Sequence, residues 1–230
     1  GLGILGILVY VVGVDKMTEV LRNADWRFVV LIIPLFVGSV VLRSLNFKIL
    51  ILPYNVKISF MTLMRISIIS WAAGMFTPGK IGELSAIYFL KKEGLDGGKS
   101  AAVNVVNKGV ITLTVAVWAL LGTLLIVGSP TAASQVGMVA VIVALPFVII
   151  GTPLGKKIIR FTARTVFKPF AQHVEQFNEE LTLFLQERRG LLLGVAAVTT
   201  VWMMLSTFLF QLAFLAVGVE VNVIHIFFIN

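Results

Sequence analysis

The chain has 230 residues, of which 58% are hydrophobic and only 13% charged, and its mean hydropathy is +1.00. Because an ordinary soluble domain carries roughly 25% charged residues, this composition predicts a polytopic membrane protein. The absence of cysteine excludes disulfides, thiol nucleophiles and thiolate metal sites. The net charge of +8 is explained by basic loops beside anionic headgroups, and no basic arm or aromatic-interleaved patch indicates nucleic-acid binding.

Apolar runs along the chain predict membrane-spanning helices, because about 20 apolar residues cross the hydrocarbon core of a bilayer. Leu2–Val14 is short for a span and has no charged leader, so we expect the remainder of a first helix in a fragment truncated at both ends. The whole chain is predicted to form a single membrane domain, residues 1–230. The predicted spans are residues 1–14, 28–45, 101–127, 136–152 and 191–217.

Basic residues in the connections predict how these spans are oriented. Pro153–Gly190 contains seven Lys and Arg residues and is therefore expected to be cytoplasmic, whereas the uncharged turn Gly128–Gln135 is expected outside. Lys91–Lys99 and Asn46–Ser59, with three and two lysines, are then also cytoplasmic. The protein is predicted to lie in the cell membrane.

Residues 60–90 begin and end on the same side in this scheme. Phe60–Phe76 has the composition of a buried helix, but the return arm Leu84–Leu90 is only about seven residues, roughly 10 Å of helix, and cannot cross. Pro78 and Gly79 lie between the arms and break the helix, because proline lacks a backbone donor and glycine frees φ. The sequence therefore predicts a re-entrant helical hairpin, whose broken backbone needs protein or water around it.

Polar and charged side chains gather near this predicted tip. The return arm starts at Ile81–Glu83, where free N–H groups and the positive end of the helix dipole form a ready anion site. In the next span, polar residues at i, i+3, i+4 and i+8 share one face, namely Asn104, Asn107, Lys108 and Thr112. The predicted lipid-headgroup site comprises Arg65, Pro78, Gly79, Lys80, Gly82, Glu83, Asn104, Asn107 and Lys108.

Structural roles for the same residues stay open at this point. Lys80 and Glu83 are three residues apart and would neutralise each other in a turn near the interface. Asn104 and Asn107 would then form interhelical hydrogen bonds worth about 0.6 kcal/mol each. Arg43, near the end of the second span, is expected to extend to the headgroups.

The cytoplasmic segment, residues 153–190, contains an amphipathic pattern. Its apolar residues repeat at 4-3-4-3 spacing, and Pro169 suits a helix start. An amphipathic helix is predicted, packed either on the ends of the spans or on the membrane surface. The pattern is too short to argue a dimerising coiled coil, and His173 is expected on the solvated face. The apolar residues are Phe170, Val174, Phe177, Leu181 and Phe184.

The predicted fold class is all-α: a polytopic helical membrane bundle with a re-entrant hairpin at residues 60–90 and a cytoplasmic amphipathic helix. Three runs resemble the lysylphosphatidylglycerol synthetase transmembrane-region family, also called flippase-like, which includes archaeal members. The runs are Arg43-Ser44-Leu45-Asn46-Phe47, Thr77-Pro78-Gly79-Lys80-Ile81-Gly82-Glu83-Leu84 and Leu90-Lys91-Lys92-Glu93-Gly94. The resemblance covers residues 40–125 well.

The resemblance implies membrane-embedded re-entrant helices. In the family's best-known members the module moves aminoacylated phospholipid between leaflets, and other members are linked to polyprenyl-lipid and glycolipid pathways. Two departures limit the transfer. Val106-Asn107-Lys108-Gly109-Val110 keeps a cation but lacks the family's Glu-Arg and following Asp, and the second Pro/Gly-rich motif is not found after Val217.

The function expected is that of a flippase-type transporter of a lipid or lipid-linked headgroup, with a membrane phospholipid or a polyprenyl-linked lipid as its partner. An anchor for a fused or partner synthase or glycosyltransferase is one alternative, and a membrane enzyme on lipid-linked substrates is another. Against the enzyme, the chain has two histidines and Glu83 as its sole embedded acid. We therefore predict no catalytic residue, metal or cofactor, although Asp15, Glu19 and Asp25 keep an enzyme open. A homo-oligomer also remains open.

Overall fold

The computed structural model describes residues 10–11, 13–127, 130–152, 154–155, 157, 161 and 171–229. Throughout this part of the chain the secondary structure is helical and no strand occurs, which confirms the all-α prediction. The α-helices are α2 (Val14–Asn23), α3 (Trp26–Ile51), α4 (Phe60–Phe76), α5 (Ser85–Lys92), α6 (Gly97–Gly122), α7 (Pro130–Gly151), α9 (Ala171–Gln186), α10 (Arg189–Ala216) and α11 (Val223–Ile229). Shorter 3-10 and π segments are η1 (Leu52–Tyr54), η2 (Pro78–Leu84) and η3 (Thr123–Val127).

Three of the described helices are long and apolar enough to cross a membrane. They are Trp26–Tyr54, Gly97–Leu125 and Arg189–Ala216, with 28 or 29 residues each and mean hydropathy between 1.8 and 2.4. At 1.5 Å per residue, each is about 42 Å long and exceeds a hydrocarbon core of about 30 Å. They contain the predicted span 28–45 and all but the last one or two residues of the predicted spans 101–127 and 191–217, and membrane localisation follows from them.

Two other predicted spans, residues 136–152 and 1–14, are not among these three helices. Residues 136–152 fall largely within α7, a helix of 22 residues that packs beside α6. Most of residues 1–14 lies outside the described residues. The polar stretch that follows it is itself helical, as α2, with no buried residue.

The helix α3 continues six residues beyond the predicted end of its span, to Ile51. The reason is tertiary packing: Asn46, Phe47 and Leu50 are all buried. Asn46 donates from Nδ2 to Thr199 Oγ1 of α10 at 3.2 Å, which ties the end of α3 to α10 inside the bundle. The connection to α4 is therefore shorter than predicted, and it turns at Asn55, whose φ is 52°.

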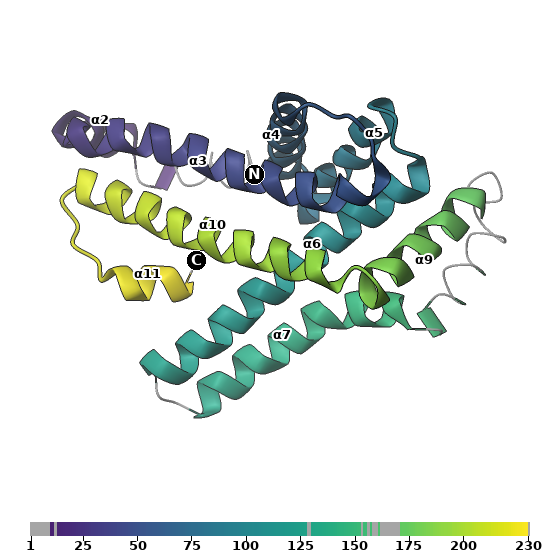
Figure 1. Cartoon of the computed structure of the whole chain (residues 1–230). Coiled ribbons are helices and arrows are strands. Elements are labelled where there is room, and N and C mark those ends of the chain that lie inside the picture. The colour runs from purple at the N-terminus through teal and green to yellow at the C-terminus, as the bar shows by residue number, and fades with distance from the viewer. Residues whose placement is uncertain are drawn as a thin grey trace.

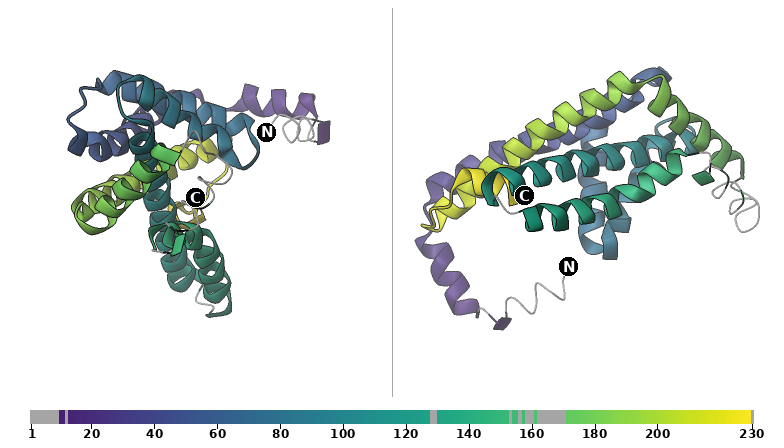
Figure 2. Two further views of the ribbon diagram at one scale, coloured as in Figure 1. Left: turned by 90° about the vertical axis from the view of Figure 1, so that its right-hand side faces the viewer. Right: turned by 90° about the horizontal axis from the view of Figure 1, so that it is seen from below.

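The helices α3 and α10 form the long axis of the bundle. They lie side by side and antiparallel, as Figures 1 and 2 show. Besides the Asn46–Thr199 contact, Trp202 Nε1 donates to Ser39 Oγ at 2.7 Å. The helix α6 crosses this pair, and α7 runs back along α6 (Figure 1).

The amphipathic helix α9 packs its apolar face on the core. Leu181 and Phe184 are 4% and 0% exposed and belong to the same core cluster as Phe47, Leu50 and Val103. Of the two placements left open by the sequence, this contact supports packing on the ends of the spans. The first residue of the pattern, Phe170, and the side chain of His173 lie outside what the structure describes.

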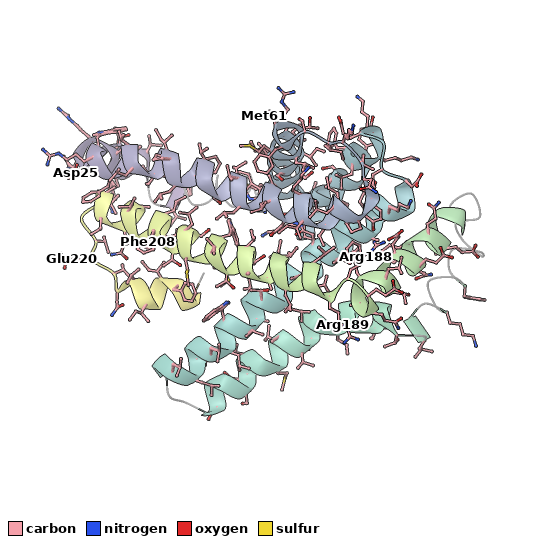
Figure 3. The ribbon with its side chains drawn as sticks, viewed as in Figure 1. Asp25, Met61, Arg188, Arg189, Phe208 and Glu220 are labelled. Carbon is pink, nitrogen blue, oxygen red and sulfur yellow. The ribbon has the colours of Figure 1, made fainter. Side chains whose placement is uncertain are left out.

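A polar cluster joins α9 to η1, the short segment that directly follows α3. Glu180 is 8% exposed and accepts hydrogen bonds from Tyr54 Oη at 2.8 Å and from Arg188 Nη1 at 3.0 Å. The Arg188 guanidinium also lies 5.3 Å and 5.5 Å from the ring centroids of Tyr54 and Phe184. Figure 3 labels Arg188 at the corner between α9 and α10. We call Tyr54, Glu180 and Arg188 the corner cluster.

Candidate functional site

Residues 60–90 form a helical hairpin, with α4 and α5 packed together through η2. Their lengths, 17 and 8 residues, repeat the long and short arms predicted from the sequence. Figures 1 and 2 together show α4 running across α3 and α10 and not along them. The entry of this hairpin into the membrane stays a prediction.

The tip of the hairpin is built by two residues in the left-handed region. Gly79 has φ 62° and Lys80 has φ 58°. Glycine adopts this conformation without strain, whereas a residue with a Cβ does so uncommonly. The break predicted at Pro78 and Gly79 is therefore present, and it carries the Lys80 side chain at its turning point.

Thr77 and two glycines close the hairpin. Thr77 Oγ1 donates to Ala73 O at 3.0 Å and accepts from Gly82 N at 2.7 Å. A Cβ on Gly82 would lie 2.3 Å from Ala73 O, and a Cβ on Gly74 would lie 2.5 Å from Glu83 Cγ. The absence of side chains at these two positions lets η2 press Glu83 against α4.

The hydrogen bonds that close the hairpin change which groups can attract an anion at the predicted site. The Gly82 and Lys80 N–H groups are used inside the turn, by Thr77 Oγ1 and Thr77 O. The free backbone donors expected at the start of the return arm are therefore occupied at these positions. Positive charge at the tip comes from side chains instead.

Glu83 is the centre of a charge cluster contributed by three elements. It is 8% exposed and accepts a charge-assisted hydrogen bond from Lys108 Nζ of α6. Arg43 Nη2 of α3 lies 4.0 Å from Glu83 Oε1. Asn104 Nδ2 donates to the backbone oxygen of Glu83 at 3.2 Å, which ties η2 to α6. We call Arg43, Glu83 and Lys108 the tip cluster.

Arg43 is held between two indole rings. Its guanidinium carbon lies 5.8 Å from the ring centroid of Trp71 and 5.5 Å from that of Trp202. Both distances are within the range of a cation–π interaction. The side chain is thus fixed inside the bundle, and the prediction that it extends to the headgroups is wrong.

A cavity of about 530 Å³ opens beside the tip cluster. Its volume is within the 300–1,000 Å³ typical of ligand pockets. Three cations and one carboxylate line it, so its walls carry an excess of positive charge. The lining residues are Arg43, Asn46, Gly79, Lys80, Ile81, Glu83, Leu84, Lys108, Ile111, Thr112, Val115, Trp202 and Met203.

The structure brings most of the predicted site residues to this cavity or directly behind it. Gly79, Lys80, Glu83 and Lys108 line it. Asn104 and Asn107 are buried, 0% and 3% exposed, on the α6 face predicted from the spacing. Gly82 closes the turn, and Pro78 is exposed at the tip.

Arg65 is the exception among the predicted residues. It is exposed on α4 and is absent from the lining of the cavities described here. Arg43 takes the place expected for it. The signal for Arg43 was its spacing from Asn46, which places both on one face of α3.

The structural alternative for Lys80 and Glu83 was that the two side chains neutralise each other. Among the described residues, the ion pairs of Glu83 join it to Arg43 and Lys108. Lys80 is exposed at the mouth of the cavity. Over the same residues, no three His, Cys, Asp or Glu side chains gather where they could share a metal ion.

Comparison with known proteins identifies one related family. The family model described as lysylphosphatidylglycerol synthase TM region matches residues 1–229, nearly the whole chain. No curated protein and no solved structure matches the chain.

Proposed function

This chain belongs to the lysylphosphatidylglycerol synthase TM region family, and we propose that it is a flippase-type transporter that moves a lipid headgroup between leaflets. The observation that carries the proposal is the tip cluster and its cavity, which place charged groups among apolar helices. On the same proposal, the protein lies in the cell membrane and residues 153–190 face the cytoplasm.

The position of the charges along the spans supports this function. Lys108 is 11 residues beyond Gly97, the first residue of α6, or about 16 Å along the helix. Arg43 is 8 residues before the end of α3 at Ile51, or about 12 Å. The tip cluster is therefore about 12–16 Å from the nearer ends of these helices, and on this proposal it lies inside a hydrocarbon core of about 30 Å. Ionisable groups at such depth mark substrate and ion pathways.

The composition of the cavity supports a headgroup as the substrate. Its lining combines the charged side chains of Arg43, Lys80, Glu83 and Lys108 with apolar residues of α6 and α10. A headgroup crossing the bilayer needs such a polar path, because unsatisfied polar groups cost several kcal/mol each in hydrocarbon. The closed hairpin holds Lys80 and Glu83 at fixed positions on this path.

A leaflet-resolved assay tests the proposal. The purified chain is reconstituted into vesicles containing phosphatidylglycerol with a fluorescent acyl chain, and dithionite reduces only the outer-leaflet dye. We expect the protected fraction to fall below that of protein-free vesicles. In the Lys80→Ala variant we expect the rate of lipid flipping to be several-fold lower. Arg65→Ala is the matched control, a cation of the same hairpin outside the cavity.

The same assay separates transport from the anchor function. An anchor for a synthase would leave the protected fraction at the protein-free level while the protein stays folded. Equal transport by wild type and Lys80→Ala would remove Lys80 from the path.

A further inference from the structure

A second cavity, of about 360 Å³, adjoins the hairpin cavity at Arg43, which lines both. We call it the apolar groove. Its walls come from α3, α4 and α10 and are mainly aromatic and aliphatic. The lining residues are Phe36, Ser39, Val40, Arg43, Ser67, Ile68, Trp71, Trp202, Ser206, Leu209 and Phe210.

Two residues line both cavities, namely Arg43 and Trp202. The guanidinium of Arg43 lies between the Trp71 and Trp202 rings, so it forms the boundary between a cationic and an apolar compartment. A third, small space of about 20 Å³ also touches Arg43 and connects it to Glu83 and Lys108. A phospholipid has the same arrangement: an anionic phosphate joined to an apolar chain.

We propose that the two cavities form one bipartite site for a phospholipid of net negative charge. The phosphate lies in the hairpin cavity among Arg43, Lys80 and Lys108, and one acyl chain lies in the apolar groove. This inference names the substrate class of the transporter proposed above and depends on that function for its role. It is tested by binding, so its failure can be told apart from a failure of transport.

Charge complementarity selects the headgroup class. Glu83 neutralises one of the three cations, which leaves the cavity with an excess of two positive charges. A phosphodiester with no cation of its own is attracted by this excess, whereas a zwitterionic choline or a cationic aminoacyl headgroup brings a positive charge that the cavity repels. Arg43 is suited to phosphate because its planar guanidinium donates two parallel hydrogen bonds.

The groove residues select an acyl chain as the other part of the ligand. Trp71 and Trp202 present ring faces on both sides of Arg43, so a ligand anchored by this guanidinium continues directly between aromatic walls. Ser206, 9% exposed, is a small residue in the lining of the groove. A larger side chain at this position would fill the space proposed for the acyl chain.

Bromine quenching of tryptophan fluorescence tests both halves of the site. The full chain in detergent, carrying Trp26→Phe and Trp118→Phe, retains Trp71 and Trp202 at the groove as its emitters. It is titrated with phosphatidylglycerol or phosphatidylcholine whose acyl chains are brominated. We expect saturable quenching by phosphatidylglycerol at a concentration at least fivefold lower than by phosphatidylcholine.

Variants locate the binding within the site. Arg43→Gln should remove the preference for phosphatidylglycerol, and Ser206→Leu should weaken quenching by both lipids because it fills the groove. Arg65→Gln should leave both titrations unchanged. Thermal unfolding of each variant identifies any loss of fold, and the Ser206→Leu result stands alone if Arg43→Gln does not fold.

Three outcomes would overturn the proposal. Equal quenching by the two lipids would remove the charge selection. An unchanged preference in Arg43→Gln would separate the phosphate from Arg43. Displacement of phosphatidylglycerol by inorganic phosphate at the same concentration would show an anion site that gains nothing from the acyl chain.

Discussion

The tip cluster and the corner cluster are built from nearly the same parts. Each has a glutamate that is 8% exposed, Glu83 or Glu180, and each glutamate has two partners from other elements. In each, an arginine lies near two aromatic rings, Arg43 near two tryptophans and Arg188 near Tyr54 and Phe184.

The difference between the clusters is what lies beside them. The tip cluster faces a cavity with a further cation, Lys80. The corner cluster packs against the fully buried Phe184 and lines none of the cavities described above. A buried carboxylate with cationic partners is therefore no sign of function by itself, and the adjoining space and unbalanced charge separate a binding site from a structural contact.

The largest expected effect on transport comes from Glu83→Gln. Loss of the carboxylate leaves Lys108 and Arg43 without their counter-charge in the path. We expect lipid flipping to fall to the level of protein-free vesicles, while folding is largely kept because both cations reach the cavity. Flipping is measured by the dithionite assay and folding by the thermal unfolding midpoint. Full transport by this variant would give Glu83 the same structural role as Glu180.

Glu180→Gln is the matched change in the corner cluster. The amide keeps a weaker acceptor for Tyr54 and Arg188, so we expect a loss of about 1–3 kcal/mol in stability and a lower unfolding midpoint. Flipping per folded molecule should be unchanged. A selective loss of transport with an unchanged midpoint would contradict the distinction between the two clusters.

Gly82→Ala perturbs the tip cluster without changing any charge. The added Cβ would lie 2.3 Å from Ala73 O, so the hairpin has to open. Overpacking of this kind costs about 1–3 kcal/mol, and transport should fall with it because Glu83 moves. Gly190→Ala is the control, since its Cβ would meet no atom within 4 Å. Equal unfolding midpoints for Gly82→Ala and Gly190→Ala would show that the close approach of Gly82 to Ala73 does not affect stability.

Cysteine labelling disturbs the protein least and tests the orientation of both clusters. The natural chain has no cysteine, so single substitutions report without background. Cysteines at Lys92 and Lys157 should react from the cytoplasm and one at Ser134 from outside. Labelling of positions 92 and 134 from the same side would contradict the topology, because α6 separates them.

Local sequence features predicted the hairpin and two of the three residues of the tip cluster, Glu83 and Lys108. The arm lengths and the Pro78-Gly79 pair gave the break, and helical spacing gave the α6 face with Asn104, Asn107 and Lys108. The remaining features depend on contacts between distant segments. Neither the pairing of Glu83 with Lys108 nor the indole sandwich around Arg43 follows from spacing within one helix.

The end of α3 illustrates the same limit. Asn46 and Lys48 resemble the start of a polar loop, but Thr199, 153 residues away, accepts the Asn46 hydrogen bond inside the bundle. Composition also left open where α9 packs, since an amphipathic face fits a membrane surface and a protein core equally well. Only the burial of Leu181 and Phe184 in the core, with α9 packed mainly on α6, distinguishes them.

The conformation of Lys80 has a consequence for engineering this protein. At φ 58°, glycine would relieve backbone strain, because it adopts the left-handed region without the steric penalty of a Cβ. A redesign guided by thermostability alone would therefore choose glycine at position 80 and remove a cation from the mouth of the cavity. On the function proposed here, that sequence would express well, resist heat and transport poorly.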